Sequence, residues 1–230
     1  MRREPVIAID GPSGVGKSTV AKQVAKRLGF ILVDTGAIYR AAALLADEVN
    51  IPWEDAKAVA TLARTHSFAF DAAGALLLDG TAVGDRIRTP RMSMGASAVA
   101  GHPEVREALL GIQRDLGKEG GIVLEGRDVG TVVFPDAEVK FFLTASAEVR
   151  ARRRFLELES KGSDVTFEAV LKDQKARDLA DSTRAVAPLK QADDAVPVIC
   201  DDMTAAEVVE EMLRIISRKE KFLFQPPSED

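Results

Sequence analysis

The chain is poor in the residues that build disulfides and metal centres. Its 230 residues include one cysteine, Cys200, and two histidines. A single cysteine cannot form an internal disulfide, and the two histidines have no cysteines at ligand spacing beside them. We therefore expect a cytoplasmic protein without a zinc site. Cys200 ends an apolar run, which fits a small buried thiol better than a nucleophile.

Long apolar runs and an excess of basic charge are also absent. No stretch approaches the length of a signal-peptide core or a membrane span. The formal net charge is −5, whereas proteins that bind nucleic acid without sequence preference are typically basic. With 46% hydrophobic residues the chain can bury a large core. We expect a monomer that folds alone and binds neither nucleic acid nor membrane.

A glycine-rich motif is the strongest feature that is present. Residues 11–18 read Gly-Pro-Ser-Gly-Val-Gly-Lys-Ser and directly follow an apolar run. This fits the phosphate-binding loop pattern, in which backbone amides and the start of the next helix bind phosphate, a lysine reaches the β- and γ-phosphates and a hydroxyl ligates Mg²⁺. The predicted metal ligand is Ser18. The predicted ATP-binding residues are Gly11, Pro12, Ser13, Gly14, Val15, Gly16, Lys17, Ser18 and Thr19.

Short apolar runs that alternate with helical patterns predict the fold. Near-continuous apolar strands are typical of a parallel sheet that is covered by helices on both faces. We therefore predict a three-layer α/β fold with a five-stranded parallel sheet. The predicted strands are residues 6–10, 30–33, 122–125, 139–143 and 196–200.

Two segments do not fit a simple alternation of strands and helices. Residues 51–119 are too long for one crossover, and they include a predicted hairpin at 75–83 with an Asp-Gly turn and a predicted helix at 103–116. We predict an inserted subdomain there. Residues 149–187 are dense in charge and predict two helices that form a lid.

The remaining ranges complete the predicted domain organisation. The last helix begins with a capping box, Thr204 to Glu207. We predict a single domain over residues 1–224, followed by a frayed tail at 225–230. Its core is expected at about 5–50, 120–148 and 188–218.

A phosphate loop alone does not distinguish a GTPase, a motor ATPase and a small-molecule kinase. A GTPase would carry Asn-Lys-x-Asp, but the one asparagine is Asn50. Transfer to a phosphorylated acceptor needs a second anion site, and the planar fork of arginine suits it. Arg40 and Arg127 follow predicted strands, where ligands of open α/β sheets bind, and Arg184 precedes another. Each arginine alone could equally be a solvated surface residue.

Together, four motifs resemble those of the bacterial cytidylate kinases, within the nucleoside monophosphate kinase family. The motifs lie at Ile9–Thr19, Asp34–Arg40, Glu125–Asp136 and Arg184–Leu189, and the resemblance covers residues 5 to about 218. It implies the sheet order 2-3-1-4-5 and a nucleoside monophosphate (NMP)-binding role for the insert. It also implies Mg²⁺-dependent transfer of the ATP γ-phosphoryl group to CMP or dCMP, which yields ADP and CDP or dCDP.

The same resemblance implies roles for individual residues. Lys17, Arg40, Arg127 and Arg184 would be catalytic, with the three arginines on the acceptor phosphate and its approach to ATP. Thr35, which stands where some members have serine, and Tyr39 would line the pocket. The cytosine contacts would be Ser97, Arg106 and Asp128, and the residues beside sugar and phosphate would be Arg177 and Asp181.

The chemistry of cytosine supports the base assignment independently. Its edge offers two acceptors and one amine donor, so an arginine and a carboxylate can read it, whereas uracil reverses two of these groups. Considered alone, Arg106 reads as a solvated arginine, Ser97 as a helix serine, and Asp128 as a group that could hold a Mg²⁺-bound water.

Alternatives remain open for the lid and for the whole chain. Arg150, Arg153 and Arg154 share one helical face that could fold over the phosphates or could be solvated. The chain could also be a kinase of UMP and CMP together, a kinase of an unrelated metabolite such as shikimate, or a regulatory protein that binds ATP without catalysis.

Overall fold

The core of the protein is a five-stranded parallel sheet, seen in a computed structural model that describes residues 4–160 and 162–223. The strands lie in the order β2-β6-β1-β7-β8, and all adjacent pairs are parallel. Numbered along the chain within this sheet, the order is 2-3-1-4-5, which confirms the prediction. The strands are β1 (Val6–Asp10), β2 (Ile31–Asp34), β6 (Ile122–Gly126), β7 (Val139–Thr144) and β8 (Val196–Ile199).

The central strand is buried because its side chains alternate between two cores. Val6 and Ala8 pack into one hydrophobic cluster, whereas Ile7 and Ile9 pack into the other. In a strand, successive side chains point to opposite faces, so helices must cover both sides of this sheet. The three-layer prediction is therefore confirmed.

Different helices supply the two cores. The cluster around Ile7 and Ile9 includes residues of α1 (Lys17–Leu28) and α8 (Ala205–Leu223), which contact one another. The opposite cluster is built on α2 (Thr35–Glu48), whose buried residues include a run from Ala41 to Ala46. The predicted capping box at the start of α8 is present, since the Glu207 carboxylate accepts the Thr204 backbone N–H at 2.7 Å.

The expectation of two buried faces is wrong for the edge strands. Ile31 on β2 is 45% exposed and Ile199 on β8 is 67% exposed. Both strands lie at the edge of the sheet and pair on one side only. An apolar run therefore predicted the strand but not its position in the sheet.

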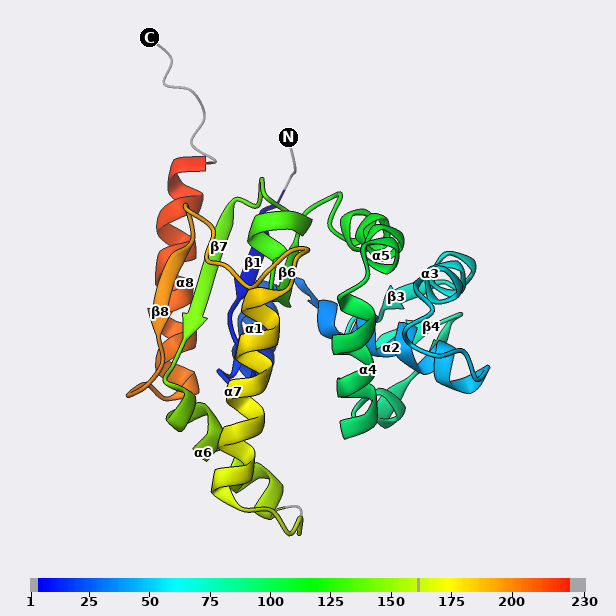
Figure 1. Cartoon of the computed structure of the whole chain (residues 1–230). Helices are drawn as coiled ribbons and strands as arrows, with labels where there is room; N and C mark the ends of the chain where they lie inside the picture. The colour runs from blue at the N-terminus through cyan, green and yellow to red at the C-terminus, as the bar shows by residue number, and fades with distance from the viewer. Residues whose placement is uncertain (1–3, 161, 224–230) are drawn as a thin grey trace.

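Residues 56–116 form a group of elements beside the sheet (Figure 1). A small antiparallel sheet includes the predicted hairpin, and Asp79 and Gly80 adopt positive φ angles in its turn. The predicted helix 103–116 is confirmed. The elements are α3 (Ala56–Thr65), β3 (Phe68–Phe70), β4 (Leu76–Leu78), β5 (Thr81–Ala82), η1 (Gly84–Ile87), α4 (Pro90–Ala100) and α5 (Pro103–Leu116).

Two helices follow the carboxyl end of β7 (Figure 1). They are α6 (Ala147–Ser160) and α7 (Phe167–Thr183), which pack against each other as the two-helix prediction required. A short π-helical turn, η2 (Val129–Val133), follows β6. The predicted tail at 225–230 lies outside the described residues. Within the described ranges, no helix is both long and apolar enough to cross a membrane.

Candidate active site

The phosphate loop, residues 11–18, connects β1 to α1 at the carboxyl end of the sheet. Gly11, Gly14 and Gly16 have positive φ angles, which glycine adopts without steric cost. A Cβ on Gly11 would lie 2.2 Å from the Leu143 carbonyl oxygen. Gly16 caps α1 without a side-chain hydrogen bond. The first backbone amides of α1 are therefore free of a side-chain cap, as an anion-binding helix start requires.

Lys17 lies buried over its own loop. Its Nζ donates hydrogen bonds to the carbonyl oxygens of Gly11 and Pro12, at 2.7 and 2.8 Å. Burial lowers the pKa of Lys17, and the positive charge of Arg127 lowers it further. An ammonium group has three N–H donors, so one remains for a ligand. A bound phosphate would offset both effects by placing negative charge between the two cations.

The other predicted ATP-binding residues divide into backbone and side-chain contributors. The Ser13 carbonyl oxygen accepts a hydrogen bond from Arg150 of α6, and the Val15 side chain is buried in the hydrophobic core. Ser18 and Thr19 are exposed in the first turn of α1. Burial raises the pKa of Glu125, and the neighbouring Ser18 hydroxyl opposes this effect.

Arg40 and Arg127 each pair with a carboxylate of this chain. Arg40 donates to Asp34 at 2.7 Å, and Arg127 Nε donates to Asp181 at 2.7 Å. All four side chains are largely shielded from solvent, with 18–28% exposure. The Arg40 Nε is buried without a hydrogen-bond partner among the described residues.

Asp128 joins two further predicted residues. Its carboxylate pairs with Arg106 and, at 3.4 Å, with Arg184. Arg106 is 7% exposed, its Nη1 has no hydrogen-bond partner in the described part of the chain, and its guanidinium lies 5.5 Å from the Tyr39 ring centroid. A buried N–H without a partner is costly. It therefore marks a position where a ligand acceptor would be stabilising.

The remaining predicted residues are less closely connected. The Thr35 hydroxyl is buried and donates to the Glu125 carbonyl oxygen at 2.8 Å. Ser97 on α4 and Arg177 on α7 are exposed, and neither side chain pairs with another side chain among the described residues. The structure thus joins Arg106, Asp128 and Arg184 directly, but it leaves Ser97 and Arg177 outside this network.

Side chains of α6 and α7 contact the backbone of the phosphate loop. Arg150 is buried and donates to the Ser13 carbonyl oxygen at 3.0 Å and to Asp178 at 2.6 and 2.9 Å. Gln174 donates to the same carbonyl at 2.8 Å. Arg153 contacts the Val15 and Cys200 carbonyl oxygens. The third arginine of the predicted lid face, Arg154, is solvated and pairs with Glu157.

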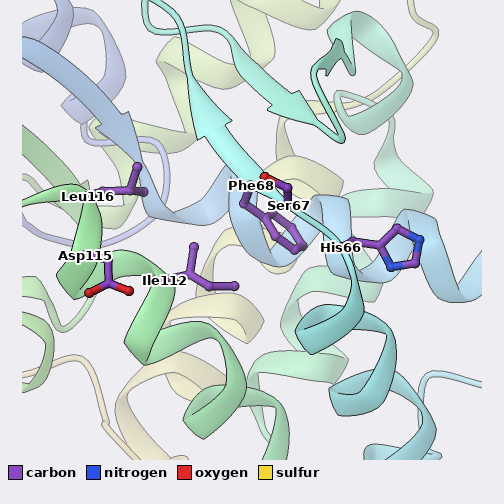
Figure 2. Close-up of a pocket in the computed structure, with 6 residues that line it drawn as sticks. All are labelled: His66, Ser67, Phe68, Ile112, Asp115 and Leu116. Atoms are coloured by element: carbon purple, nitrogen blue, oxygen red, sulfur yellow. The ribbon is translucent and has the colours of Figure 1, made fainter.

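A pocket of about 340 Å³ lies elsewhere, between β3 and the end of α5 (Figure 2). Its lining residues are His66, Ser67, Phe68, Ile112, Asp115 and Leu116. None of them is a predicted site residue. The candidate site is therefore defined by its buried charges and not by this pocket.

Sequence reasoning did not identify two buried carboxylates beside the phosphate loop. Asp10 and Glu125 are 4% exposed at the carboxyl ends of β1 and β6, beside the phosphate loop. Burial raises the pKa of Asp10 to about 6 and also raises that of Glu125. The signal available was an acidic residue at the end of each buried strand, where ligands of such sheets bind.

Comparisons with known proteins agree with this geometry. The family model "Cytidylate kinase" matches residues 7–218. Similar proteins include the cytidylate kinase of Syntrophotalea carbinolica, 46% identical over 96% of this chain and 95% of that protein, and that of Citrifermentans bemidjiense, 49% identical over 90% of each.

A solved structure shares the fold at low sequence identity. It is an uncharacterised protein from Eubacterium ventriosum, with a TM-score of 0.52 and 13% identity over 93% of this chain and 99% of that one. This likeness concerns the fold alone. The match over residues 7–218 and the identity to its relatives show that the chain belongs to the cytidylate kinase family.

Proposed function

We propose that this protein transfers the γ-phosphoryl group of ATP to CMP or dCMP, giving ADP and CDP or dCDP. The observation that carries the proposal is the placement of two cations at the carboxyl edge of the sheet. Lys17 is buried on the phosphate loop, and Arg127 directly follows the neighbouring strand β6. Burial lowers the pKa of Lys17, and the positive charge of Arg127 lowers it further. Two cations that repel each other are stabilised by an anion between them. Membership of the cytidylate kinase family supports the assignment of that anion as the phosphate that passes between two nucleotides.

The donor side binds ATP through the phosphate loop. Backbone amides of residues 11–19 and the start of α1 surround the phosphates, while Lys17 contacts the β- and γ-phosphates. Arg150 and Gln174 hold the Ser13 carbonyl from the lid. We infer that this contact keeps the loop in its binding conformation and that the lid region 149–187 excludes water from ATP.

The residues near the phosphate loop fit a magnesium ion. The Ser18 hydroxyl contacts the Glu125 carboxylate, and the Glu125 Oε1 is buried without a hydrogen-bond partner among the described residues. Hydroxyl and carboxylate oxygens are the ligands that Mg²⁺ prefers. Ser18 would ligate the ion and Glu125 would hold one of its waters. When bound, the ion neutralises charge on the β- and γ-phosphates.

The acceptor side binds the monophosphate between the sheet and the insert 51–119. We assign the CMP phosphate to Arg40, Arg127 and Arg184, hereafter the acceptor arginines. Cytosine is read by Arg106 and Asp128, because the unpartnered Arg106 N–H can donate to the base and the carboxylate can accept from its amine. Completing the pocket are Thr35, Tyr39 and Ser97, with Arg177 and Asp181 beside the sugar and phosphate.

The reaction needs little acid–base chemistry from the protein. A phosphomonoester has a second pKa near 6, so its attacking oxygen is already ionised at neutral pH. Catalysis is then positioning and charge neutralisation by Lys17 and the acceptor arginines. We expect the enzyme to work as a cytoplasmic monomer on small nucleotides, without nucleic acid or membrane.

Product analysis with a panel of acceptors tests the proposal. Mg-ATP is incubated with CMP, dCMP, UMP, AMP or no acceptor, and all nucleotides are quantified by chromatography. We expect equal amounts of ADP and CDP with CMP, the corresponding result with dCMP, and little turnover with the others. Comparable use of UMP would refute the cytosine assignment. ADP formation without an acceptor, or none with any acceptor, would refute the acceptor site.

A further inference from the structure

We propose that Asp10 is a positioning residue that fixes the segment bearing Arg127 and Asp128 against the phosphate loop. This inference rests on the proposed function and adds a residue to it. Asp10 is the last residue of β1 and immediately precedes Gly11. It therefore lies directly before the phosphate loop, which forms the donor half of the site. Its side chain contacts the segment that follows Arg127 and Asp128, two residues of the acceptor half.

The contact is a double hydrogen bond across two strands. The Val129 N–H donates to Asp10 Oδ1 at 2.8 Å, and the Gly130 N–H donates to Oδ2 at 2.7 Å. Asp10 is 4% exposed and Val129 is fully buried. These amides open the turn η2, and such amides have no partner within their own helix. The Asp10 carboxylate serves as their cap from a neighbouring strand, and we call this arrangement the Asp10 clamp.

The backbone on both sides of Arg127 and Asp128 is held in place by close contacts. The Phe134 N–H, directly after η2, donates to the Val129 carbonyl oxygen at 2.7 Å and closes the turn. At its start, a Cβ on Gly126 would lie 2.6 Å from Thr35 Oγ1 and 2.7 Å from Val129 Cγ2. Arg127 and Asp128 lie between this crowded glycine and the clamp. A shift of the clamp would therefore displace both residues.

Through the single residue Asp10, the clamp connects the phosphate loop to the segment that carries Arg127 and Asp128. The carbonyl oxygen of Gly11, next to Asp10, accepts the Lys17 ammonium at 2.7 Å. At the other end of the clamp, Arg127 and Asp128 carry the acceptor pairs with Asp181 and Arg106. Phosphoryl transfer requires the two phosphates in line, and misplacement by about 1 Å can cost about 100-fold in rate. We infer that the clamp sets this alignment.

The first test substitutes Asp10→Asn, which keeps the size of the side chain but turns one acceptor into a donor that faces a backbone N–H. We expect kcat with CMP to fall about 10- to 100-fold. The Kd for ATP, measured by calorimetry, should change less than about threefold. A parallel loss of ATP affinity would overturn the inference, because Asp10 would then act through Lys17.

A matched control separates the clamp from the general loss of a carboxylate that accepts two backbone amides. Asp71 also accepts two backbone amides, those of Ala73 and Ala75 at 2.9 and 2.8 Å, but it lies in the turn between β3 and β4 of the insert. Asp71→Asn should leave kcat within about twofold of the wild type. An equal loss in both variants would overturn the special role of Asp10.

A double-mutant cycle tests whether Asp10 acts through Arg127. Asp10→Asn should cost less than about threefold in kcat when Arg127 is already methionine, because there is no guanidinium left to position. Full additivity of the two losses would contradict the inference. If Asp10→Asn does not fold, Gly126→Ala provides a second variant, since its Cβ would lie 2.6 Å from Thr35 Oγ1 and 2.7 Å from Val129 Cγ2 and would displace the clamped segment. We expect it to lower kcat in the same way.

Amide hydrogen exchange gives a readout that does not depend on turnover. In Asp10→Asn, exchange at residues 129–134 should rise, while ATP should still protect residues 11–19. Unchanged exchange at 129–134 would overturn the clamp. If the wild type failed to phosphorylate CMP, the proposed function would fail, and the clamp would stand or fall on this measurement.

Discussion

The donor and acceptor halves of the site are built in different ways. The proposed donor half is one continuous loop, residues 11–18, whose glycines adopt positive φ angles and which leads into a helix start without a side-chain cap. The acceptor half combines charged side chains of α2, α5 and α7 with others that directly follow β6 and α7. A local motif thus suffices for a phosphate that is bound by backbone, whereas a second nucleotide needs residues that only the tertiary fold brings together.

The two halves also hold their cations differently. Lys17 donates hydrogen bonds to neutral carbonyl oxygens, whereas Arg40 and Arg127 form ion pairs with the carboxylates of Asp34 and Asp181. When a phosphate binds, the Lys17 ammonium gains a charged partner in addition to neutral carbonyl groups. At the acceptor arginines, the phosphate must share the guanidinium with a carboxylate. We therefore expect the donor cation to gain more from its ligand than any single acceptor arginine.

The largest expected effect is the loss of the donor cation. Lys17→Met should lower kcat at least about 1,000-fold, because a buried charge on the transferred phosphoryl group is worth several kcal/mol. The measurement is CMP-dependent ADP formation under saturating Mg-ATP. Activity within about tenfold of the wild type would show that the backbone alone provides the donor half.

Loss of one acceptor arginine should cost less. In Arg127→Met we expect kcat to fall about 100- to 1,000-fold with ATP binding retained, because Arg40 and Arg184 remain on the phosphate. Arg154→Ala is the control, since this lid arginine is solvated and pairs only with Glu157 among the described side chains. Unchanged turnover in Arg127→Met would remove this residue from the catalytic set.

The Asp10 clamp predicts a pH dependence of stability. Burial raises the pKa of Asp10 from 3.8 to about 6 in the folded state, so the folded protein binds more protons than the unfolded chain between these values. The contribution of Asp10 to the free energy of unfolding is therefore largest below pH 4. It falls as the pH rises through about 6, by up to about 3 kcal/mol.

Urea denaturation of the wild type and Asp10→Asn at several pH values measures this change. The stability difference between the two proteins should shrink from pH 4 to pH 7, because only the wild type titrates at residue 10. Glu125 titrates in both proteins, so its contribution cancels in the difference. A difference that grows over this range would contradict the raised pKa.

The smallest expected effect concerns the base and not the phosphate. Asp128→Asn should lower kcat/KM for CMP about tenfold more than for UMP, because the amide no longer offers only acceptors to the cytosine amine. Measuring both acceptors on one preparation makes each the control for the other. Equal losses would mean that Asp128 only holds Arg106 and Arg184 in place.

The sequence was sufficient for the sheet and for the donor loop because both have local signals. Apolar runs marked all five strands of the large sheet to within one residue at each end, and the glycine pattern marked the loop. The edge positions of β2 and β8 could not be derived from hydrophobicity, since an edge strand can be as apolar as a central one. Only the family resemblance supplied the strand order.

The acceptor half was predicted by resemblance and not by local pattern. Arg106 reads as a solvated residue on an amphipathic helix, yet it is 7% exposed because Asp128 lies opposite it on a segment far away in the sequence. Asp10 was missed as the cap of η2 for the same reason. Asp34 was also missed, although it lies only six residues before its partner Arg40. Ion pairs and caps between distant segments carry no sequence period, so they emerge only once the strands are in register.

A crossed binding experiment tests most directly whether the two halves act separately. ATP and CMP are titrated by calorimetry into Lys17→Met and Arg127→Met. We expect Lys17→Met to lose at least about tenfold in ATP affinity and Arg127→Met at least about tenfold in CMP affinity, with the other ligand within about threefold in each case. If either variant lost affinity for both nucleotides equally, the division into a donor half and an acceptor half would be wrong.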